Sequence, residues 1–375
     1  MSKKKIIFLT GTRADFGKLK SLIQILQNHH QIEPYIFVTG MHMLQQYGYT
    51  LIEVEKSGFK NISTFKNYTH ETSMDLTLAK TIEGFSAYVK KINPDLIVVH
   101  GDRAEAMAGA IVGSLNNILV AHIEGGELSG TIDELIRHSI SKLSHIHFVA
   151  NKEAKERLLQ MGELEASIKI IGSPDVDIMF SNQLPSLKEV KKYYEIPFEN
   201  YAIAMLHPVT TEIKYMKQYA ENFAEALINS EKKYVVIYPN NDLGSSTIFS
   251  AYENFSGNKN FRVFPSIRFE YFLTLLKNAD FIIGNSSAGI REAPYYGIPT
   301  INIGTRQENR SFHSHIVNTG YGVNEILKAI NTNPVKETVA KKFGNGSSAV
   351  KFMESLKSKE LWSMNHQKQF KDFNA

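Results

Sequence analysis

The sequence predicts an α/β protein built from two doubly wound, Rossmann-like domains. Short apolar runs rich in β-branched residues recur along the chain, and each is followed by a polar or glycine turn and then by a helical stretch. This alternation is typical of a parallel sheet with helical crossovers. A chain of 375 residues is also longer than one ordinary core supports, so two domains of this class are expected.

The first series of runs lies in the N-terminal half. Its predicted strands, each with the turn that follows it, are KIIFLTG (5–11), YIFVTG (35–40), DLIVVHGD (95–102), ILVAHIEGG (118–126), HIHFVAN (145–151) and IKIIGSPD (168–175). The stretches between them leave room for crossover helices. We therefore expect one parallel sheet over residues 1–180.

A second series builds the other domain. Its runs are YAIAMLHP (201–208), KYVVIYPNND (233–242), FRVFPS (261–266), DFIIGNSS (280–287) and PTINIG (299–304). Past Gly304 the pattern weakens, and helices are expected near 325–329, 349–357 and 359–373.

The two series are separated by a stretch with the composition of a linker. Residues 181–200 contain prolines at 185 and 197 around a charged middle, which indicates an interdomain connection. The expected ranges are 1–180 for the first domain, 200–355 for the second, and 356–375 for a C-terminal helix that can pack back on the first. The active site is expected in the cleft between the two domains.

Composition excludes several classes of function. The absence of cysteine excludes a disulfide framework, a thiolate nucleophile and a cysteine zinc site, and it fits a reducing compartment such as the cytoplasm. The formal charge is only +4 and the basic residues are dispersed, so no nucleic-acid partner is indicated. No apolar stretch approaches the ~20 residues of a membrane span, so no membrane partner is expected. The C-terminal lysines are expected to form a solvated helix face: Lys351, Lys357, Lys359, Lys368 and Lys371.

The densest chemistry lies between Ala121 and His147. A predicted strand ends at Glu124, and a predicted helix begins near Asp133. Strand exits of this kind are where α/β proteins place ligands. Four neighbouring residues are expected to support this site or to lie on the surface: Glu127, Glu134, Arg137 and His138.

A third carboxylate follows another predicted strand. Asp102 and Arg103 stand at the end of DLIVVHGD, where they either form an ion pair with each other or contribute separately to a site. If they do not pair, Asp102 joins Glu124 and Asp133. Crowded carboxylates shift one another's pKa values, so that one can act as an acid and another as a base.

Two turns are suited to anions. GTRADFGK (11–18) joins the first strand to the first helix, and Arg13 adds a bidentate donor for phosphate, although no P-loop motif is present. GNSSAGIREAPYYGIP (284–299) places Ser286 and Ser287 at a helix start, where they either cap the helix or bind a ligand. Glu292 inside that helix can accept the two hydroxyls of a ribose, and Arg306 follows the next strand. Together these residues suggest a nucleoside diphosphate.

Histidines raise the question of a metal. His100, His122, His138, His145 and His147 are close in sequence, but their spacing matches no recognised site of three convergent ligands. No metal is therefore expected, and His122, His145 and His147 are interpreted as hydrogen-bonded residues in or near the core. His207 is different, because it follows the first strand of the second domain.

With these motifs in order, the chain resembles the UDP-N-acetylglucosamine 2-epimerase family, and within it the hydrolysing bacterial branch that makes N-acetylmannosamine for sialic acid. The matching segments run from about residue 10 to 307: GTRADFGKL, VTGMHM, HGDRAEA, HIEGGELSGTIDELIRHSISKLSH, GSPDVD, LHPVTTE, YPNND and GNSSAGIREAPYYGIPTINIGTRQ. Non-hydrolysing members resemble E-A-G-L-R-T after the strand glutamate, whereas this chain has E-G-G-E-L-S-G-T from Glu124 to Thr131.

The resemblance implies two Rossmann-like domains in the glycosyltransferase-B arrangement, with UDP held mainly by the second. It implies that Asp102, Glu124 and Asp133 are the acid/base groups. Lys18, which would lie near them, and His207 are also expected to be catalytic residues. The residues implied to bind UDP are Arg13, Arg103, His207, Asn240, Ser286, Ser287, Glu292 and Arg306, together with the loop at Ile267, whose backbone would meet uracil. The resemblance implies no cofactor. It implies that the protein forms a homodimer or a homotetramer.

The implied reaction converts UDP-N-acetylglucosamine and water to N-acetylmannosamine and UDP through a 2-acetamidoglucal. Three alternatives stay open. The same chemistry could act on UDP-N,N'-diacetylbacillosamine, a glycosyltransferase of the same architecture could share the nucleotide site, and a sugar-nucleotide sensor could bind without turnover.

Overall fold

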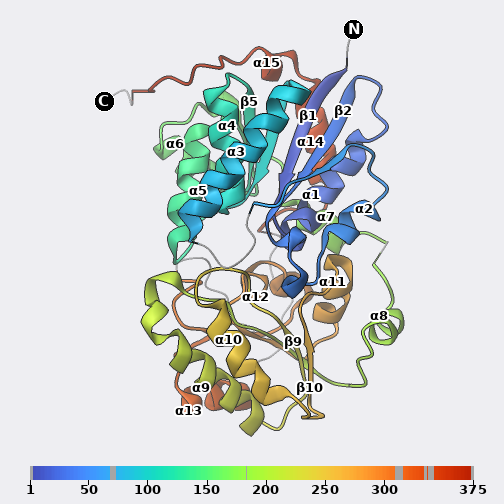
Figure 1. Cartoon of the computed structure of the whole chain (residues 1–375), viewed down its shortest axis with the longest axis vertical. Coiled ribbons are helices and arrows are strands. Elements are labelled where there is room, and N and C mark those ends of the chain that lie inside the picture. Colours follow the sequence, from blue (N-terminus) through green and yellow to red (C-terminus); the bar gives the residue numbers. More distant parts are fainter. Residues whose placement is uncertain are drawn as a thin grey trace. The chain divides into compact units, whose positions relative to one another are not determined.

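The structure is a computed structural model that describes residues 3–67, 73–182, 184–308, 316–332, 336 and 342–372. The chain forms two compact units. Unit 1 comprises Met1–Glu127, Asp133–Asn182 and Lys342–Ala375, and unit 2 comprises Leu128–Ile132 and Gln183–Lys341. Each unit has its own parallel sheet and its own core (Figure 1). The predicted fold class, with two doubly wound α/β sheets, is confirmed.

The sheet of unit 1 has, among the described residues, seven parallel strands in the order β3-β2-β1-β4-β5-β6-β7. The order reverses between β1 and β4, which pair directly. An open parallel sheet binds ligands beyond the carboxyl ends of its strands at such a reversal. The strands are β1 (Lys4–Thr10), β2 (Ile32–Val38), β3 (Ile62–Thr64), β4 (Leu96–His100), β5 (Leu119–Ile123), β6 (Ile146–Val149) and β7 (Ile168–Ile170).

Helices cover both faces of this sheet, which explains the nearly continuous apolar strands. On one face, Ile6 and Phe8 pack into the cluster that includes α1 and α14. On the other, Gly109 lets α4 approach closely, because a Cβ there would collide with Val99. The helices of unit 1 are α1 (Arg13–Leu26), α2 (Leu51–Glu55), α3 (Met74–Ile92), α4 (Ala104–Leu115), α5 (Ile132–Leu143), α6 (Lys152–Gln160), α7 (Pro174–Met179), α14 (Ser348–Lys357) and α15 (Lys359–Trp362), with 3-10 turns at Gly40–Met43, Gln45–Tyr47 and Glu165–Ser167.

Unit 2 repeats the same plan. Its described strands form a six-stranded parallel sheet in the order β10-β9-β8-β11-β12-β13, which reverses between β8 and β11. The strands are β8 (Ala202–Met205), β9 (Tyr234–Ile237), β10 (Phe261–Phe264), β11 (Ile282–Gly284), β12 (Thr300–Ile303) and β13 (Ile316–Thr319). The helices are α8 (Leu187–Tyr193), α9 (Met216–Asn229), α10 (Ser245–Tyr252), α11 (Phe269–Lys277), α12 (Ala288–Arg291) and α13 (Val323–Asn331), with 3-10 turns at Thr210–Tyr215, Glu253–Phe255 and Ala293–Tyr296.

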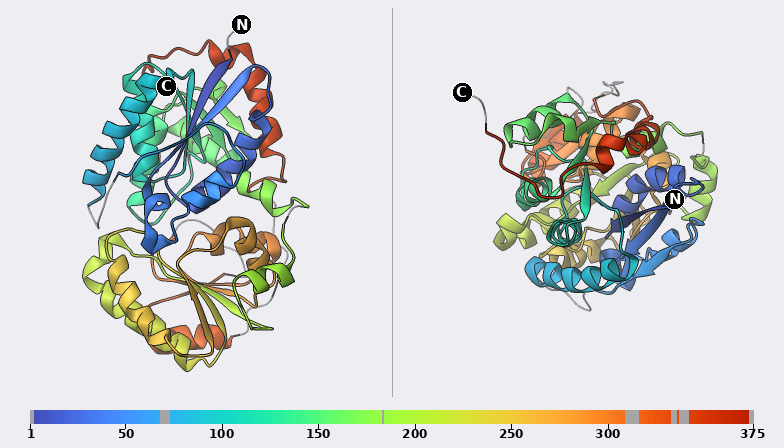
Figure 2. Two further views of the ribbon diagram at one scale, coloured as in Figure 1. Left: turned by 45° about the vertical axis from the view of Figure 1, so that its right-hand side comes forward. Right: turned by 90° about the horizontal axis from the view of Figure 1, so that it is seen from above.

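The C-terminal segment returns to unit 1, as the left view of Figure 2 shows for the chain coloured red. Phe352 of α14 is fully buried, and its ring centroid lies 4.9 Å from that of Phe148 in the sheet. Asp177 caps this helix by accepting hydrogen bonds from the backbone N–H groups of Ser348 (2.8 Å) and Ala349 (2.7 Å). The return therefore begins at Lys342 and not at the expected residue 356.

The expected helix over 359–373 is wrong beyond Trp362, where α15 ends. Residue 373 lies outside the described residues. The tail is instead held by single hydrogen bonds: Lys368 Nζ donates to the carbonyl oxygens of Lys142 (2.9 Å) and Ser144 (2.6 Å) at the end of α5. It also pairs with Glu163 at 2.5 Å, so Lys368 is not part of a solvated helix face.

The expected helices near 325–329 and 349–357 are present as α13 and α14. None of the helices in the described part of the chain is long and apolar enough to cross a membrane.

Candidate functional site

The carboxyl edge of the unit 1 sheet carries most of the residues expected to be catalytic. Arg13 begins α1 directly after the turn that follows β1. Asp102 and Arg103 follow β4, and Glu124 follows β5. Because these strands are parallel neighbours, their carboxyl ends meet at one edge, and the predicted side chains are brought to the reversal point of the sheet.

Glu124 has a strained backbone. Its φ of 63° lies in the left-handed region, which costs a residue with a side chain roughly 1–2 kcal/mol. Such strain persists only where the surroundings hold it, and it is concentrated at functional sites. Here Arg137 Nη1 donates to the Glu124 carbonyl oxygen at 2.7 Å, so the turn is fixed from the next helix.

The side chain of Glu124 is 3% exposed and surrounded by donors. The Ser173 hydroxyl donates to Oε1. Oε2 lies 3.1 Å from His100 Nε2 and 3.6 Å from Lys18 Nζ. One hydroxyl and two basic side chains therefore contact the carboxyl oxygens of Glu124.

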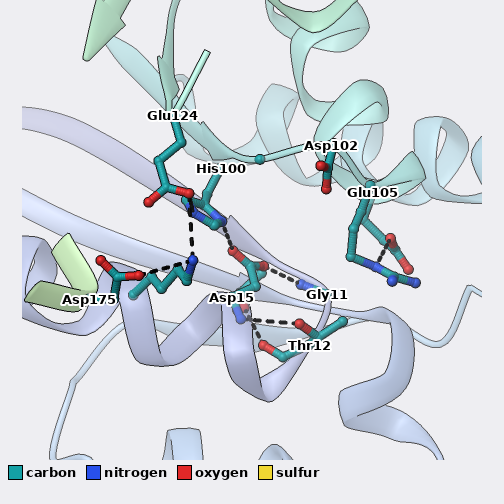
Figure 3. Close-up of polar contacts among 12 residues, drawn as sticks. Gly11, Thr12, Asp15, His100, Asp102, Glu105, Glu124 and Asp175 are labelled. Carbon is teal, nitrogen blue, oxygen red and sulfur yellow. Dashed lines mark hydrogen bonds and ion pairs between the residues drawn. The ribbon is translucent and has the colours of Figure 1, made fainter. Parts of the chain in front are cut away.

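His100 bridges two carboxylates. Its Nδ1 lies 3.0 Å from Asp15 Oδ1, and its Nε2 faces Glu124, so the imidazole joins α1 to the end of β5 (Figure 3). Burial opposes the charged form, but the charges of Glu124 and Asp15 outweigh it and raise the pKa of His100 to about 9. His100 is therefore an imidazolium at neutral pH.

Asp15 extends this link to the turn after β1. The backbone N–H of Gly11 donates to Asp15 Oδ2 at 3.0 Å, and the backbone N–H of Asp15 donates to Thr12 Oγ1 at 3.1 Å (Figure 3). These bonds cap α1 and set the turn that carries Arg13. The expected anion-binding turn and Glu124 are thus connected through one charged histidine.

Lys18 lies between two buried carboxylates. Its Nζ is 3.2 Å from Asp175 Oδ2, in the first turn of α7, as well as 3.6 Å from Glu124. Lys18 is only 8% exposed. A buried lysine requires such partners, because a lone ammonium is costly to remove from water.

Asp102 pairs with Arg137 Nη2 of α5, and Arg103 Nε donates to Glu105 Oε2 at 3.3 Å. Asp102 and Arg103 each therefore have an ionic partner outside the Asp102-Arg103 dipeptide. Arg137 is 4% exposed, so it is a buried bridge between Asp102 and the backbone of Glu124 and not a surface residue.

Asp133 lies in the first turn of α5, four residues before Arg137. Residues four apart share a helix face, so Asp133 and the guanidinium that holds Asp102 project from the same side of α5. The helix thus carries Asp133 and also Arg137, which contacts Asp102 and the backbone of Glu124.

The other clustered histidines are hydrogen-bonded in the core. His122 Nε2 lies 2.8 Å from the Gly101 carbonyl oxygen, and burial lowers the pKa of His122 to about 3. His147 is buried and bonded to Glu163 at 2.9 Å. His145 Nε2 lies 3.0 Å from the carbonyl oxygen of His366 in the tail. Within the described part of the chain, no three His, Asp or Glu side chains are grouped so that they could hold a metal ion.

Sequence reasoning missed Asp15, Ser173, and the roles of His100 and Arg137. The signal for His100 was available, because it ends β4 directly beside the strand that carries Glu124. The signal for Asp15 was its place three residues after Thr12, at the start of α1. Ser173 gave no local signal, and Arg137 was expected only to support the site or to lie on the surface.

In unit 2, His207 follows β8 at the reversal point. Asn285, directly after β11, binds the His207 peptide through both ends of its amide: His207 N–H donates to Oδ1 at 2.6 Å, and Nδ2 donates to the His207 carbonyl oxygen at 2.8 Å. Gly284 permits this approach, because a Cβ there would overlap the carbonyl oxygen of Met205.

The serine turn differs from the expectation. The helix after Ser286 and Ser287 is a single turn, α12, so Glu292 stands at the junction with a 3-10 turn and not inside a helix. Ser286 Oγ accepts a hydrogen bond from Ala288 N at 3.3 Å, whereas Ser287, the N-cap residue of α12, makes no side-chain cap hydrogen bond. A helix of one turn has only a small dipole, so any anion binding here depends on individual N–H and hydroxyl groups.

The remaining expected ligand residues of unit 2 also follow strands. Asn240 follows β9, and its backbone N–H donates to His207 Nδ1 at 3.0 Å. Arg306 follows β12, and its Nη1 donates to the Asn285 carbonyl oxygen at 3.3 Å. Ile267 lies between β10 and α11 with its side chain fully buried. Asn285 therefore connects His207 to the Arg306 loop, and sequence reasoning did not single it out.

Comparison with known proteins shows which family the chain is similar to. The family model described as UDP-N-acetylglucosamine 2-epimerase matches residues 24–357. A protein named UDP-N-acetylglucosamine 2-epimerase from Neisseria meningitidis is 50% identical over 99% of this chain and 100% of its own length. UDP-N,N'-diacetylbacillosamine 2-epimerase (hydrolyzing) from Legionella pneumophila is 32% identical over 96% of this chain and 97% of its own.

A solved structure has the same fold. The crystal structure of a UDP-GlcNAc 2-epimerase from Neisseria meningitidis bound to UDP-GlcNAc matches with a TM-score of 0.79 at 19% identity, over 94% of this chain and 99% of that one. At this identity the likeness establishes the fold alone. Membership rests on the family match and on the more similar relatives, and from these the chain belongs to the UDP-N-acetylglucosamine 2-epimerase family.

Proposed function

We propose that this protein converts UDP-N-acetylglucosamine and water to N-acetylmannosamine and UDP. The observation that carries the proposal is the carboxylate arrangement at the edge of the unit 1 sheet. Glu124 is held in a strained turn by Arg137, and its side chain contacts His100 and Lys18. Asp102 is held by the same Arg137, and Asp133 begins the same helix. The Legionella relative, whose name includes hydrolyzing, supports a reaction that releases the nucleotide.

The first step must break the bond between C1 and the pyrophosphate. C2 carries no adjacent carbonyl, so its proton is poorly acidic until departure of UDP gives C1 oxocarbenium character. A carboxylate then takes the C2 proton, the C1–C2 double bond forms, and UDP leaves with the electron pair of the C1–O bond. The products of this step are 2-acetamidoglucal, UDP and a protonated carboxyl group.

The second step adds water across the double bond. A carboxyl group on the opposite face of the sugar gives a proton to C2, while the water oxygen bonds to C1 and loses a proton to the enzyme. The two faces require different groups, so we assign the steps to Asp102, Glu124 and Asp133, with Lys18 beside Glu124. General acid/base catalysis of this kind contributes roughly 100 to 10,000-fold in rate.

UDP departure needs stabilisation of its phosphates. We assign this to Arg13 and Arg103 of unit 1 and, in unit 2, to the residues around Asn285. Those residues are His207, Asn240, Ser286, Ser287, Glu292 and Arg306, with the Ile267 backbone for uracil. Each hydrogen bond to a charged phosphate contributes roughly 1.5–3 kcal/mol.

The proposal is tested by incubating the full chain with UDP-N-acetylglucosamine in deuterated water and following the products by NMR. The expected products are UDP and N-acetylmannosamine that carries deuterium at C2. N-acetylmannosamine without deuterium would exclude the elimination route. UDP-N-acetylmannosamine as the product would exclude hydrolysis, and UDP release only after addition of an acceptor sugar would indicate a glycosyltransferase.

Single variants separate the two steps. Asp102→Asn, Glu124→Gln and Asp133→Asn are compared for release of UDP and for accumulation of 2-acetamidoglucal. Loss of the base should abolish UDP release, whereas loss of the second proton donor should leave UDP release and accumulate the glycal. Binding of UDP-N-acetylglucosamine with no turnover in the wild-type protein, and no effect of Asp102→Asn, would indicate a sensor.

The name of the Legionella relative also favours a second substrate. Side-by-side rates on UDP-N-acetylglucosamine and UDP-N,N'-diacetylbacillosamine decide the choice, because the two sugars differ only around C4 and C6. We expect the higher kcat/KM on UDP-N-acetylglucosamine, in line with the name of the Neisseria relative at 50% identity.

A further inference from the structure

The ring of His207 receives a hydrogen bond whose direction is fixed. The backbone N–H of Asn240 points at His207 Nδ1 at a distance of 3.0 Å. A backbone N–H can only donate, so Nδ1 must accept and cannot carry a proton. In the neutral ring the proton is then on Nε2.

The directions of the hydrogen bonds to the backbone of His207 are determined in the same way. The His207 N–H must donate, so the oxygen of the Asn285 amide faces it at 2.6 Å. The His207 carbonyl must accept, so the Asn285 nitrogen faces it at 2.8 Å. This orientation leaves no choice between the two ends of the amide, and Asn285 is fully buried.

Asn285 also determines the position of the loop after β12. Its carbonyl oxygen accepts hydrogen bonds from Gln307 Nε2 at 2.8 Å and from Arg306 Nη1 at 3.3 Å. One residue thus holds the histidine after β8 and the arginine after β12 at the reversal point of the unit 2 sheet.

We propose that Asn285 is a positioning residue that, together with the Asn240 peptide, holds His207 as a neutral Nε2–H donor toward a phosphate oxygen of the nucleotide. His207 then binds UDP and does not transfer protons. As an acid, it would have to become an imidazolate, and as a base through Nδ1, it would have to displace the Asn240 N–H. This inference rests on the proposed function, in which unit 2 binds a nucleoside diphosphate, and it removes His207 from the acid/base group.

The first test reads the ring directly. Nitrogen-15 NMR of the full chain at neutral pH, without ligand and with UDP, reports which ring nitrogen of each histidine is protonated. The His207 signals are assigned as those missing from His207→Gln. The expected result is a proton on Nε2 in both states. A proton on Nδ1, or an imidazolium in the UDP complex, would overturn the inference.

The second test measures UDP affinity by calorimetry. His207→Ala should weaken UDP binding by roughly 10- to 100-fold, the equivalent of one hydrogen bond to a charged group. His207→Gln keeps an amide donor near the Nε2 position and should restore part of that loss. Asn285→Asp keeps the acceptor for the His207 N–H but sets a carboxylate oxygen against the His207 carbonyl, so it too should weaken UDP binding.

The matched control is Asn302→Asp. Asn302 is also a buried amide in the unit 2 sheet, but its Nδ2 bonds to Asn318 at 2.8 Å and not to His207. It should change neither UDP affinity nor the His207 tautomer. Unchanged UDP affinity in Asn285→Asp would overturn the positioning role. If the wild-type protein does not bind UDP, the proposed function fails as well, whereas normal UDP binding with the wrong tautomer overturns only the present inference.

Discussion

Replacing His100 by glutamine should remove the part of the unfolding free energy of unit 1 that is present at low pH and is lost as the pH rises through 9. The histidine stands between Asp15 and Glu124, and these carboxylates raise its pKa from 6.5 to about 9 despite its burial. A raised pKa means that the folded state binds the proton more tightly than the unfolded chain does. The resulting stability is fully present below pH 6.5 and is lost as the pH rises through 9.

The magnitude follows from the pKa difference. Each unit corresponds to about 1.36 kcal/mol, so the charged histidine contributes about 3 kcal/mol at pH 6. At pH 7.5 the contribution falls to about 2 kcal/mol, and above pH 9 it approaches zero. His42 behaves in the opposite way, because burial lowers its pKa to about 4. Its contribution is present above pH 6.5 and decreases as the pH falls toward 4, so the two histidines act on different sides of neutrality.

Urea unfolding of wild-type protein and His100→Gln measures the effect. The chain has one tryptophan, Trp362, which lies in unit 1, so its fluorescence reports the unfolding of the unit that contains His100. The difference in unfolding free energy between the two proteins should shrink by about 3 kcal/mol from pH 6 to pH 9.5. Lysines and tyrosines that titrate above pH 9 are common to both proteins, and their effects cancel in the difference. A difference that stays constant with pH would refute the assignment of His100 as a cation.

Three further predictions concern other parts of the chain. Gly284→Ala should destabilise unit 2 by at least about 3 kcal/mol in urea unfolding, because its Cβ would overlap the Met205 carbonyl oxygen at a φ of 130°. Lys368→Met should cost roughly 2–3 kcal/mol in thermal unfolding, since it removes charged hydrogen bonds from Glu163 and from the end of α5. Arg137→Met should lower kcat for UDP release about 100-fold or more, because Asp102 loses its guanidinium partner.

Matched variants control each of these. Gly257→Ala has a φ of 74° but open space around its Cβ, so it should cost only about 1 kcal/mol, and an equal loss in Gly284→Ala would count against the steric reason. Lys351→Met removes an exposed lysine from α14 and should be nearly neutral, and a similar loss there would contradict the capping role of Lys368. Arg137→Lys keeps the positive charge but lacks the two separate guanidinium donors that reach Asp102 and the Glu124 carbonyl oxygen. Activity equal to wild type in this variant would argue against the bridge between Asp102 and Glu124.

The sequence by itself determined eleven of the strands and the two-sheet plan, whereas the short strands β3 (Ile62–Thr64) and β13 (Ile316–Thr319) were not predicted. The apolar runs, the glycine turns and the polar residues that follow them are local features, and in a parallel sheet such features mark the ends of strands. This is why the sequence alone places Asp102, Glu124, His207 and Arg306 at sheet edges.

Only the tertiary structure decided which of these residues meet. Arg137 reaches Asp102 across 35 residues, His100 reaches Glu124 across 24, and Asn285 holds His207 across 78. Lys368 donates to the carbonyl oxygen of Ser144 across 224 residues. Such pairs depend on the order and register of the strands and on the strained turn at Glu124, none of which has a local signature. The positions of these residues at strand ends were therefore predictable. The hydrogen bonds that orient and connect their side chains form only when the strands assemble into sheets.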